Sequence, residues 1–383
     1  MKKYLSTFFP QDSILGIDIG NYAIKFVLFD KTDEDISLKN FGYVQLNIPQ
    51  DVEPAERKTI ISEEISKYVK KEGIKTKYAA TSVSGNSVIT RYIKVPKMDK
   101  KELDLRISSE AEAFIPFDIN DVVLSYFIIN DDLFEDGQSR MELVLVAVKK
   151  ELIDERTEII TAAGLIPVLI DVDSFAIENV VNFIEGKPSE NNRSIMVINI
   201  GQRLTNISIL VNNILVSNDK KEQVFPFYSK LVRDVFVGGY SIDRMISKKL
   251  NLDIHNVDEI KKSAKILVSD EDKMEAIKNY DKFTISTSRI ISSVVKELIN
   301  DINRSIDFFI SSGMDVSISK IYLCGGCSSI KNLDKFMFNE LKIPIEYINP
   351  FAFVKNRPDN VPDHILNSLA VAAGLSLRSI KDL

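Results

Sequence analysis

Residues 14–29, ILGIDIGNYAIKFVLF, decide the expected fold. Two runs rich in β-branched and apolar residues flank Gly20 and Asn21, and this pattern is typical of a β-hairpin. Asp18 lies inside the first run, where a buried carboxylate is costly unless it has a function. The stretch therefore predicts a hairpin that carries chemistry at its turn.

A second stretch repeats this plan. Residues 194–211, SIMVINIGQRLTNISILV, again hold an apolar run, a polar residue (Asn199), a glycine (Gly201), a short polar link and a second run. Two copies of one hairpin about 180 residues apart indicate a duplicated fold with two related halves. Two unrelated hairpins are the alternative.

Strands and helices alternate through the remainder of the chain. Apolar spacing and glycine or proline stops predict the following segments. Strands are expected at 78–83, 121–129, 141–148, 168–172 and 318–323, and helices at 54–72, 100–114, 149–163, 175–184, 258–267, 286–312, 331–341 and 363–378. Residues 186–193 are polar, contain a proline and fit a linker between the halves. The alternation predicts an α/β architecture.

Composition excludes several classes of protein. The chain has 383 residues, 45% hydrophobic and 27% charged, which suits two or three globular domains rather than collagen, coiled coil or disorder. A formal net charge of -6 argues against a protein that mainly coats nucleic acid. Two cysteines and two histidines exclude a closed zinc site, and the low cysteine count fits a reducing compartment.

Hydropathy predicts a cytoplasmic protein. No window approaches the 18 consecutive apolar residues of a membrane-spanning helix. The apolar part of the first ten residues is too short for a secretory signal and is followed by Pro10, Gln11 and Asp12. We therefore expect this chain to meet a membrane only through a partner.

The first hairpin has the chemistry of a phosphate site. Asp18, Gly20 and Lys25 form the pattern D-x-G-x-x-x-x-K. A glycine turn lets backbone N–H groups approach phosphate oxygens. The carboxylate of Asp18 can hold Mg²⁺ through water, and the Lys25 ammonium can reach the terminal phosphates. By itself the pattern also fits a purely structural hairpin.

Two further glycine turns extend this site. The second hairpin offers the same chemistry at Gly201, Gln202, Arg203, Leu204, Thr205 and Asn206, so two facing loops would clamp a nucleotide's phosphates. The strand at 318–323 runs into Cys324-Gly325-Gly326-Cys327, where paired glycines let a flat nucleoside lie against bare backbone. A tight strand-to-helix turn is the structural alternative, and a redox role for the two cysteines is weaker still.

The three glycine turns, in this order, resemble the actin-like ATPase superfamily. Its phosphate 1 motif corresponds to residues 18–25, its phosphate 2 motif to 199–205 and its adenosine motif to 323–328. In that superfamily two RNase-H-like halves close around ATP and Mg²⁺. The resemblance is closest to the PilM family of type IV pilus assembly, which is related to the cell-division family FtsA.

Segments outside the turns carry the PilM resemblance. Residues 95–98 (VPKM), 110–111 (EA) and 114–117 (FIPF) resemble that family's small inserted subdomain, and residues 164–176 resemble the segment that returns from it. Residues 237–240 (VGGY) and 259–262 (EIKK) resemble a stretch whose glutamate and lysine approach the nucleoside. The similarity spans about residues 15–375.

The resemblance implies a set of site residues. ATP or ADP would be bound by Asp18, Gly20, Asn21, Tyr22, Lys25, Gly201, Gln202, Arg203, Thr205, Asn206, Gly238, Gly239, Glu259, Lys262, Gly325, Gly326 and Cys327. Asp18 and Asn199 would hold Mg²⁺ through water. Asp171 and Asp173 lie in the segment that carries the water-activating acid, and Asp173 is the catalytic candidate.

The resemblance also implies a domain division. The first half would span 13–190 and include an inserted subdomain at about 86–165. The second half would span 194–350, with a further subdomain at about 240–312. Residues 351–383 would return as a C-terminal helix to the first half.

One residue departs from the family pattern. Phosphate 2 usually starts with Asp, and this chain has Asn199. Asparagine keeps the shape and an acceptor oxygen but loses a negative charge near the divalent ion. We therefore expect a chain that binds ATP and hydrolyses it slowly or not at all.

The resemblance implies a nucleotide-dependent scaffold. Its partners would be the N-terminal cytoplasmic peptide of a PilN-like inner-membrane protein, bound in the region of residues 86–164, and the motor and platform proteins of pilus assembly. ATP would bias closure of the halves without requiring turnover. The alternatives are a sugar or acid kinase of the same superfamily, an FtsA-like filament protein and the cytoplasmic part of a type II secretion protein.

Overall fold

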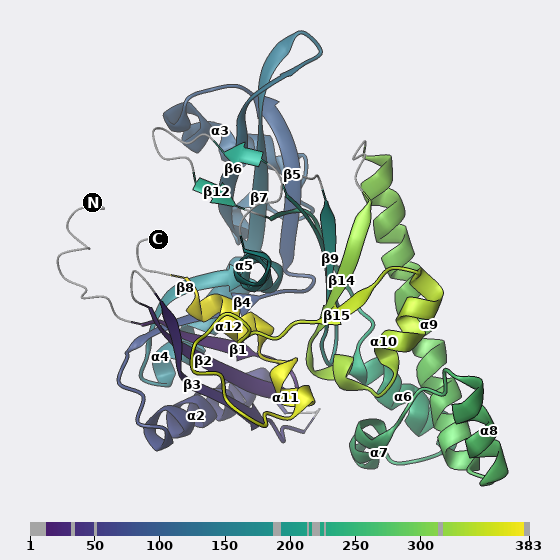
Figure 1. Cartoon of the computed structure of the whole chain (residues 1–383). Helices are drawn as coiled ribbons and strands as arrows, with labels where there is room; N and C mark the ends of the chain where they lie inside the picture. Colours follow the sequence, from purple (N-terminus) through teal and green to yellow (C-terminus); the bar gives the residue numbers. More distant parts are fainter. Residues whose placement is uncertain are drawn as a thin grey trace.

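The computed structural model describes residues 13–31, 35–49, 52–186, 193–212, 214–216, 223–225, 227–312 and 317–378 (Figure 1). Residues 187–192 of the expected linker and residues 379–383 lie outside this described part.

The first hairpin folds as expected and starts a mixed sheet. β1 (Leu15–Ile19) and β2 (Ala23–Lys31) are antiparallel, and Asp18 lies opposite Lys25 in their register. The sheet has the order β3-β2-β1-β4-β8 and is completed by β3 (Ile36–Gln45), β4 (Tyr78–Val83) and β8 (Ile166–Val172). β4 runs parallel to β1, and β8 runs parallel to β4.

The second sheet repeats the first. Its order is β13-β10-β9-β14-β15, with bounds β9 Ser194–Ile200, β10 Thr205–Val211, β13 Tyr228–Val235, β14 Ile318–Cys324 and β15 Ile345–Tyr347. β10 is antiparallel to both of its neighbours, whereas β14 is parallel to β9 and to β15. The same order and directions in both sheets agree with a duplicated fold.

Helices cover both sheets and fill the space between them. α2 (Pro54–Lys71) and α4 (Lys150–Ala162) pack on the outer face of the first sheet, where Leu15 and Ile17 meet Ile65 and Ile160. α6 (Gly239–Leu250), α9 (Lys282–Ser311) and α10 (Leu333–Leu341) pack on the second sheet. α5 (Asp173–Glu185) and α12 (Ala370–Ser376) lie between the sheets and share one apolar core with both (Figure 1).

A small subdomain projects from the first sheet between β4 and α4. It consists of α3 (Lys100–Glu112), η1 (Ile119–Asp121) and a three-stranded sheet in the order β5-β7-β6 (Figure 1). β5 is Val88–Pro96, β6 is Val122–Glu135 and β7 is Gln138–Lys149. Strands β6 and β7 form a hairpin and extend further toward each other than the expected strands at 121–129 and 141–148. The reason is that only Asp136 and Gly137, both with positive φ, form the turn between them.

The second sheet carries its own helical insertion. It contains α6, η2 (Ile254–Asn256), α7 (Val257–Ser263), α8 (Asp270–Lys278) and α9. The helix expected at 258–267 ends at Ser263, because the backbone N–H of Ile266 donates instead to the Lys331 carbonyl. β11 (Ile214–Val216) and β12 (Gln223–Phe225) form a separate two-stranded pair.

The C-terminal helix is also shorter than expected. Residues 363–378 form two helices, α11 (Asp363–Leu366) and α12, instead of one. The break lies at Asn367, whose carbonyl accepts from the Gly325 N–H and so is held by a tertiary contact. No helix in the described ranges is long and apolar enough to cross a bilayer.

Close backbone packing of α12 gives the first prediction. A Cβ on Gly374 would lie 1.7 Å from the Ala176 carbonyl oxygen in α5. We expect Gly374→Ala to lower the free energy of unfolding by roughly 3 kcal/mol, since backbone on both sides resists displacement. Urea unfolding followed by circular dichroism measures this change.

Gly326→Ala is the matched control, because a Cβ there meets nothing within 4 Å. An unchanged unfolding midpoint for Gly374→Ala would show that α5 and α12 separate readily.

Candidate functional site

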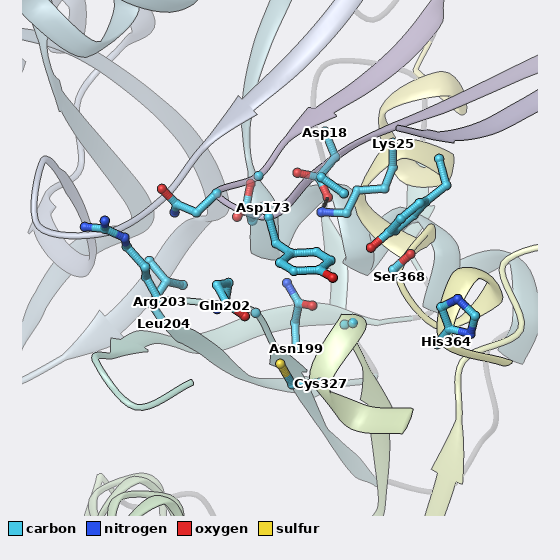
Figure 2. A pocket seen from close by; sticks show the side chains of 18 of the residues that line it. Asp18, Lys25, Asp173, Asn199, Gln202, Arg203, Leu204, Cys327, His364 and Ser368 are labelled. Atoms are coloured by element: carbon cyan, nitrogen blue, oxygen red, sulfur yellow. Dashed lines mark hydrogen bonds and ion pairs between the residues drawn. The ribbon is translucent and has the colours of Figure 1, made fainter. Parts of the chain in front are cut away.

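A cavity of about 540 Å³ opens between the two sheets, and residues of both halves line it. Figure 2 shows Asp18, Lys25 and Asp173 along one side and Asn199, Gln202 and Cys327 along the other. The carboxyl ends of β1 and β9 therefore face each other across one space, as the duplicated hairpins require.

The first wall is the turn after β1. The Gly20 N–H donates to the Ala23 carbonyl at 3.1 Å, which closes the turn. The carboxylate of Asp18 forms an ion pair of 2.9 Å with the Lys25 ammonium, directly across the hairpin. A Cβ at Gly20 would lie 2.9 Å from the Ala23 carbonyl oxygen, a backbone atom of the same turn, so the turn needs glycine.

The second wall is the turn after β9. The Gly201 N–H donates to the Leu204 carbonyl at 2.9 Å. The Asn199 amide donates to Asn206 Oδ1, and the Asn206 amide donates to Asp234 Oδ1. The side-chain N–H of Asn199 is thus already used in a hydrogen bond, and Asn199 Oδ1 lies beside Gly325.

The third wall is the turn after β14, which leads into η3 (Gly326–Ser329). Gly325 has φ of 91°, and a Cβ there would lie 2.4 Å from the Ile200 carbonyl, so only glycine fits. Cys324 and Cys327 are free and buried, and burial raises the pKa of both thiols. Raised thiol pKa values disfavour the reactive thiolate and argue against the redox alternative.

Helix α7, which belongs to the second half, also contributes side chains to the cavity. The Tyr22 hydroxyl donates to Asp258 Oδ2 at 2.5 Å and so connects the first glycine turn to α7. Asp258 also pairs with the Lys262 ammonium at 2.9 Å, while Lys261 pairs with the buried Asp243 at 2.8 Å. Of these contacts, the Tyr22–Asp258 hydrogen bond links the two halves across the cavity, and the two ion pairs hold α7 in place.

Asp173 is the first residue of α5 and points into the cavity (Figure 2). Burial, and then the negative charge of Asp18, raise the pKa of the Asp173 carboxyl to about 6, against the hydrogen bonds from Ser82 and Ser84. Asp171, in contrast, is paired with the Arg378 guanidinium at 2.8 Å. The structure thus separates a structural carboxylate at 171 from a candidate functional one at 173.

The donors present fit a hydrated Mg²⁺. Asp18, Asp173 and the Asn199 Oδ1 supply oxygen ligands on one cavity, and two close carboxylates favour a cation. Among the described residues no group of three Asp, Glu, His or Cys side chains forms a metal cage. The set therefore suits an ion held by one or two carboxylates and by a ligand's phosphates.

Most of the implied site residues line this cavity. They are Asp18, Gly20, Asn21, Tyr22, Lys25, Asp173, Asn199, Gly201, Gln202, Arg203, Asn206, Lys262, Gly325, Gly326 and Cys327.

Four of the implied residues do not line the cavity. Thr205 is buried, and its hydroxyl donates to the Val237 carbonyl. Gly238 and Gly239 pack behind the second turn, where the Gly239 N–H donates to the Gly201 carbonyl. The Glu259 side chain is 84% exposed and points to solvent, because α7 turns the preceding residue, Asp258, toward the cavity.

The cavity is also lined by residues outside the quoted motifs. They are Tyr43, Ser82, Ser84, Arg156, Asp258, Ser329, Asp363, His364 and Ser368. Most are supplied by strand ends and helices far from the glycine turns in sequence. His364, for example, is the second residue of α11, near the C-terminal end of the described chain.

Comparisons with known proteins place the fold in a class. The family model described as type IV pilus assembly protein PilM matches residues 16–380. The solved structure of the PilM-PilN type IV pilus biogenesis complex is similar with a TM-score of 0.76 and 25% identity, over 96% of this chain and 98% of that one. The ethanolamine utilization protein EutJ from Carboxydothermus hydrogenoformans is similar in fold, with a TM-score of 0.53 and 12% identity, over 96% and 90% of the two chains.

The protein therefore has the actin-like ATPase fold, with two duplicated halves around a cleft. Within that class, the chain belongs to the family of the type IV pilus assembly protein PilM, which confirms the resemblance found in the sequence.

The raised pKa of Asp173 predicts a stability change. The unfolded carboxyl ionises near 3.8 and the folded one near 6, so the unfolded state releases its proton first as the pH rises. The folded state therefore loses stability between about pH 4 and pH 6, and the loss persists above that range. We expect Asp173→Asn to raise the free energy of unfolding by up to about 3 kcal/mol at pH 7.5 and hardly at all at pH 4.

Urea unfolding across this pH range, without nucleotide or metal, measures the effect. Asp307→Asn is the control, since Asp307 lies exposed on α9. If Asp173→Asn raises the free energy of unfolding equally at pH 4 and pH 7.5, the raised pKa of Asp173 is contradicted.

Proposed function

We propose that this protein is a cytoplasmic, ATP-binding scaffold at the inner-membrane assembly platform of a type IV pilus. It binds the N-terminal peptide of a PilN-like membrane protein and works with the motor and platform proteins of the same machine. The observation that carries this proposal is the likeness to the PilM-PilN complex structure over 96% of the chain. The protein in that structure is in complex with PilN, so a PilN-like protein is the partner to expect here.

The cavity supports nucleotide binding. Its volume of about 540 Å³ falls in the range of small-molecule and cofactor sites. The turns at Gly20 and Gly201 line the cavity from the two halves, and a Cβ at Gly326 would meet nothing within 4 Å, so the third turn presents bare backbone there. ATP or ADP with Mg²⁺ matches this combination of surfaces.

One feature supports slow hydrolysis or none: Asn199 provides no charge where a carboxylate would help to hold Mg²⁺. Asp173, the candidate general base, has a pKa of about 6, which suits a residue that accepts a proton from an attacking water near neutral pH, so the limit on hydrolysis would lie in the metal site. ATP would then act by favouring the closed arrangement of the halves, which requires binding alone.

The inserted subdomain offers a surface for an extended peptide. Its sheet buries one face under α3, through Leu103 and Ile107, and β6 is an edge strand. Val123 and Phe127 lie four residues apart on the opposite face of β6, and each is 43% exposed. An extended segment can add to such an edge while its side chains contact the apolar residues.

The missing charge at position 199 can be restored. We expect Asn199→Asp to tighten binding of ATP in the presence of Mg²⁺ by about tenfold relative to binding in EDTA, because a second charge acts on the ion. Phosphate release should rise at the same time. Calorimetric titration and a phosphate assay on one sample give both numbers.

Asn303→Asp adds the same charge on the exposed side of α9 and serves as the control. If Asn199→Asp changes neither the dependence on Mg²⁺ nor hydrolysis, charge at this position does not limit the site.

The peptide site predicts a difference between two phenylalanines of β6. We expect Phe127→Ala to weaken binding of a fluorescent PilN-like N-terminal peptide by about tenfold, since a contacting aromatic ring is lost. Phe134→Ala should leave affinity unchanged, because Phe134 is 78% exposed beside the hairpin turn. Fluorescence anisotropy measures both, and equal affinity for the two variants would place the peptide elsewhere.

A further inference from the structure

The cations around the cavity fall into two groups. The three lysines each have a carboxylate partner: Lys25 pairs with Asp18, Lys261 with Asp243, and Lys262 with Asp258. Arg203 also lines the cavity, yet among the described residues no carboxylate lies within ion-pair distance of Arg203 or of the nearby Arg57.

Three guanidinium groups gather at this place. Arg57 comes from α2, Arg156 from α4 and Arg203 from the turn between β9 and β10. Burial lowers the pKa of Arg57, and the positive charges of Arg203 and Arg156 lower it further, against the negative charge of Glu155, so both arginines lie near enough to repel Arg57. Arg156 has a single carboxylate contact, 3.1 Å to its neighbour Glu155. Repulsion among these groups is relieved when an anion enters between them.

Arg156 and Arg203 line the cavity, and Arg57 stands next to it. Arg57 donates weakly to Asn21 Oδ1, at 3.5 Å, and so stands beside the first glycine turn. Arg156 donates to the Ser82 carbonyl, which lies on the strand next to β1. Figure 2 shows Arg203 at the opposite end of the cavity from His364 and Ser368. An elongated ligand whose anionic tail lies between the glycine turns would place the tail's end among the arginines.

We propose that Arg57, Arg156 and Arg203 form a subsite for the terminal phosphate of a nucleoside triphosphate and thereby discriminate triphosphate from diphosphate. Guanidinium forks suit phosphate oxygens and form charge-assisted hydrogen bonds with them. Arg57 and Arg156 belong to the first half, and Arg203 belongs to the second. A terminal phosphate shared by them draws the halves together, whereas a diphosphate ends short of the cluster. This inference rests on the proposed nucleotide site and names the group that regulates it.

The test compares MgATP with MgADP by calorimetric titration into the full chain. We expect the unaltered protein to bind ATP more tightly than ADP. Arg203→Gln and Arg57→Gln should each weaken ATP binding by about tenfold or more and change ADP binding less than twofold, since a charged hydrogen bond to one phosphate is lost. Arg203→Lys keeps the charge and loses the fork, so its effect on ATP should be intermediate.

Arg244→Gln is the matched control. Arg244 lies exposed on α6 and outside the cavity, and its loss changes the net charge equally. Equal losses for ATP and ADP, or no loss in Arg203→Gln and Arg57→Gln, would overturn the terminal-phosphate subsite and leave nucleotide binding intact. Absence of binding of both nucleotides to the unaltered protein would overturn the nucleotide site itself.

Discussion

Close contact of α12 with both α5 and β1 is the constraint on which the other features depend. Gly16 admits the Ala372 carbonyl to the face of β1, and Gly374 admits the Ala176 carbonyl of α5. Side chains at either position would push the helices apart and open the core that both sheets share. The packing of α5 and α12 joins the two halves through this shared core. The carboxyl ends of β1 and β9 lie beyond the core and form walls of the cavity.

The cavity balances its own charges over most of its surface. Lysine–carboxylate pairs on its walls offset each other's charge, and the Tyr22 hydroxyl connects the Asp258–Lys262 pair to the first half. A ligand with phosphates must therefore compete with Asp18 for Lys25. In the proposed site Asp18 would instead help to hold Mg²⁺, whose charge would offset that of the carboxylate and leave Lys25 to the ligand's phosphates. The pairing in the structure is thus consistent with a site that needs both groups together.

The sequence predicted the elements that local chemistry specifies. Glycine turns flanked by apolar runs identified both hairpins, and the turns brought together most of the cavity. The missed features depend on tertiary contacts. Asp258 faces the cavity instead of Glu259 because of the rotation of a two-turn helix, and α12 starts after Asn367 because Gly325 binds its carbonyl. The sequence did not predict that Arg57, Arg156 and Arg203 lie close together, since they belong to α2, α4 and a distant turn.

Helix α5 connects the cavity to the inserted subdomain. Its first residue, Asp173, faces the cavity, and five residues later Glu178 accepts hydrogen bonds from the backbone and the hydroxyl of Ser229 on β13. The next residue, Lys230, pairs with Glu142 of β7 at 2.5 Å, and both side chains are largely buried. Burial raises the pKa of Glu178 to about 7, so this junction is held by hydrogen bonds to a carboxyl near its titration point. One continuous set of contacts therefore runs from the cavity through α5 and β13 to the sheet of the inserted subdomain, by way of the Ser229 hydrogen bonds and the buried Lys230–Glu142 ion pair.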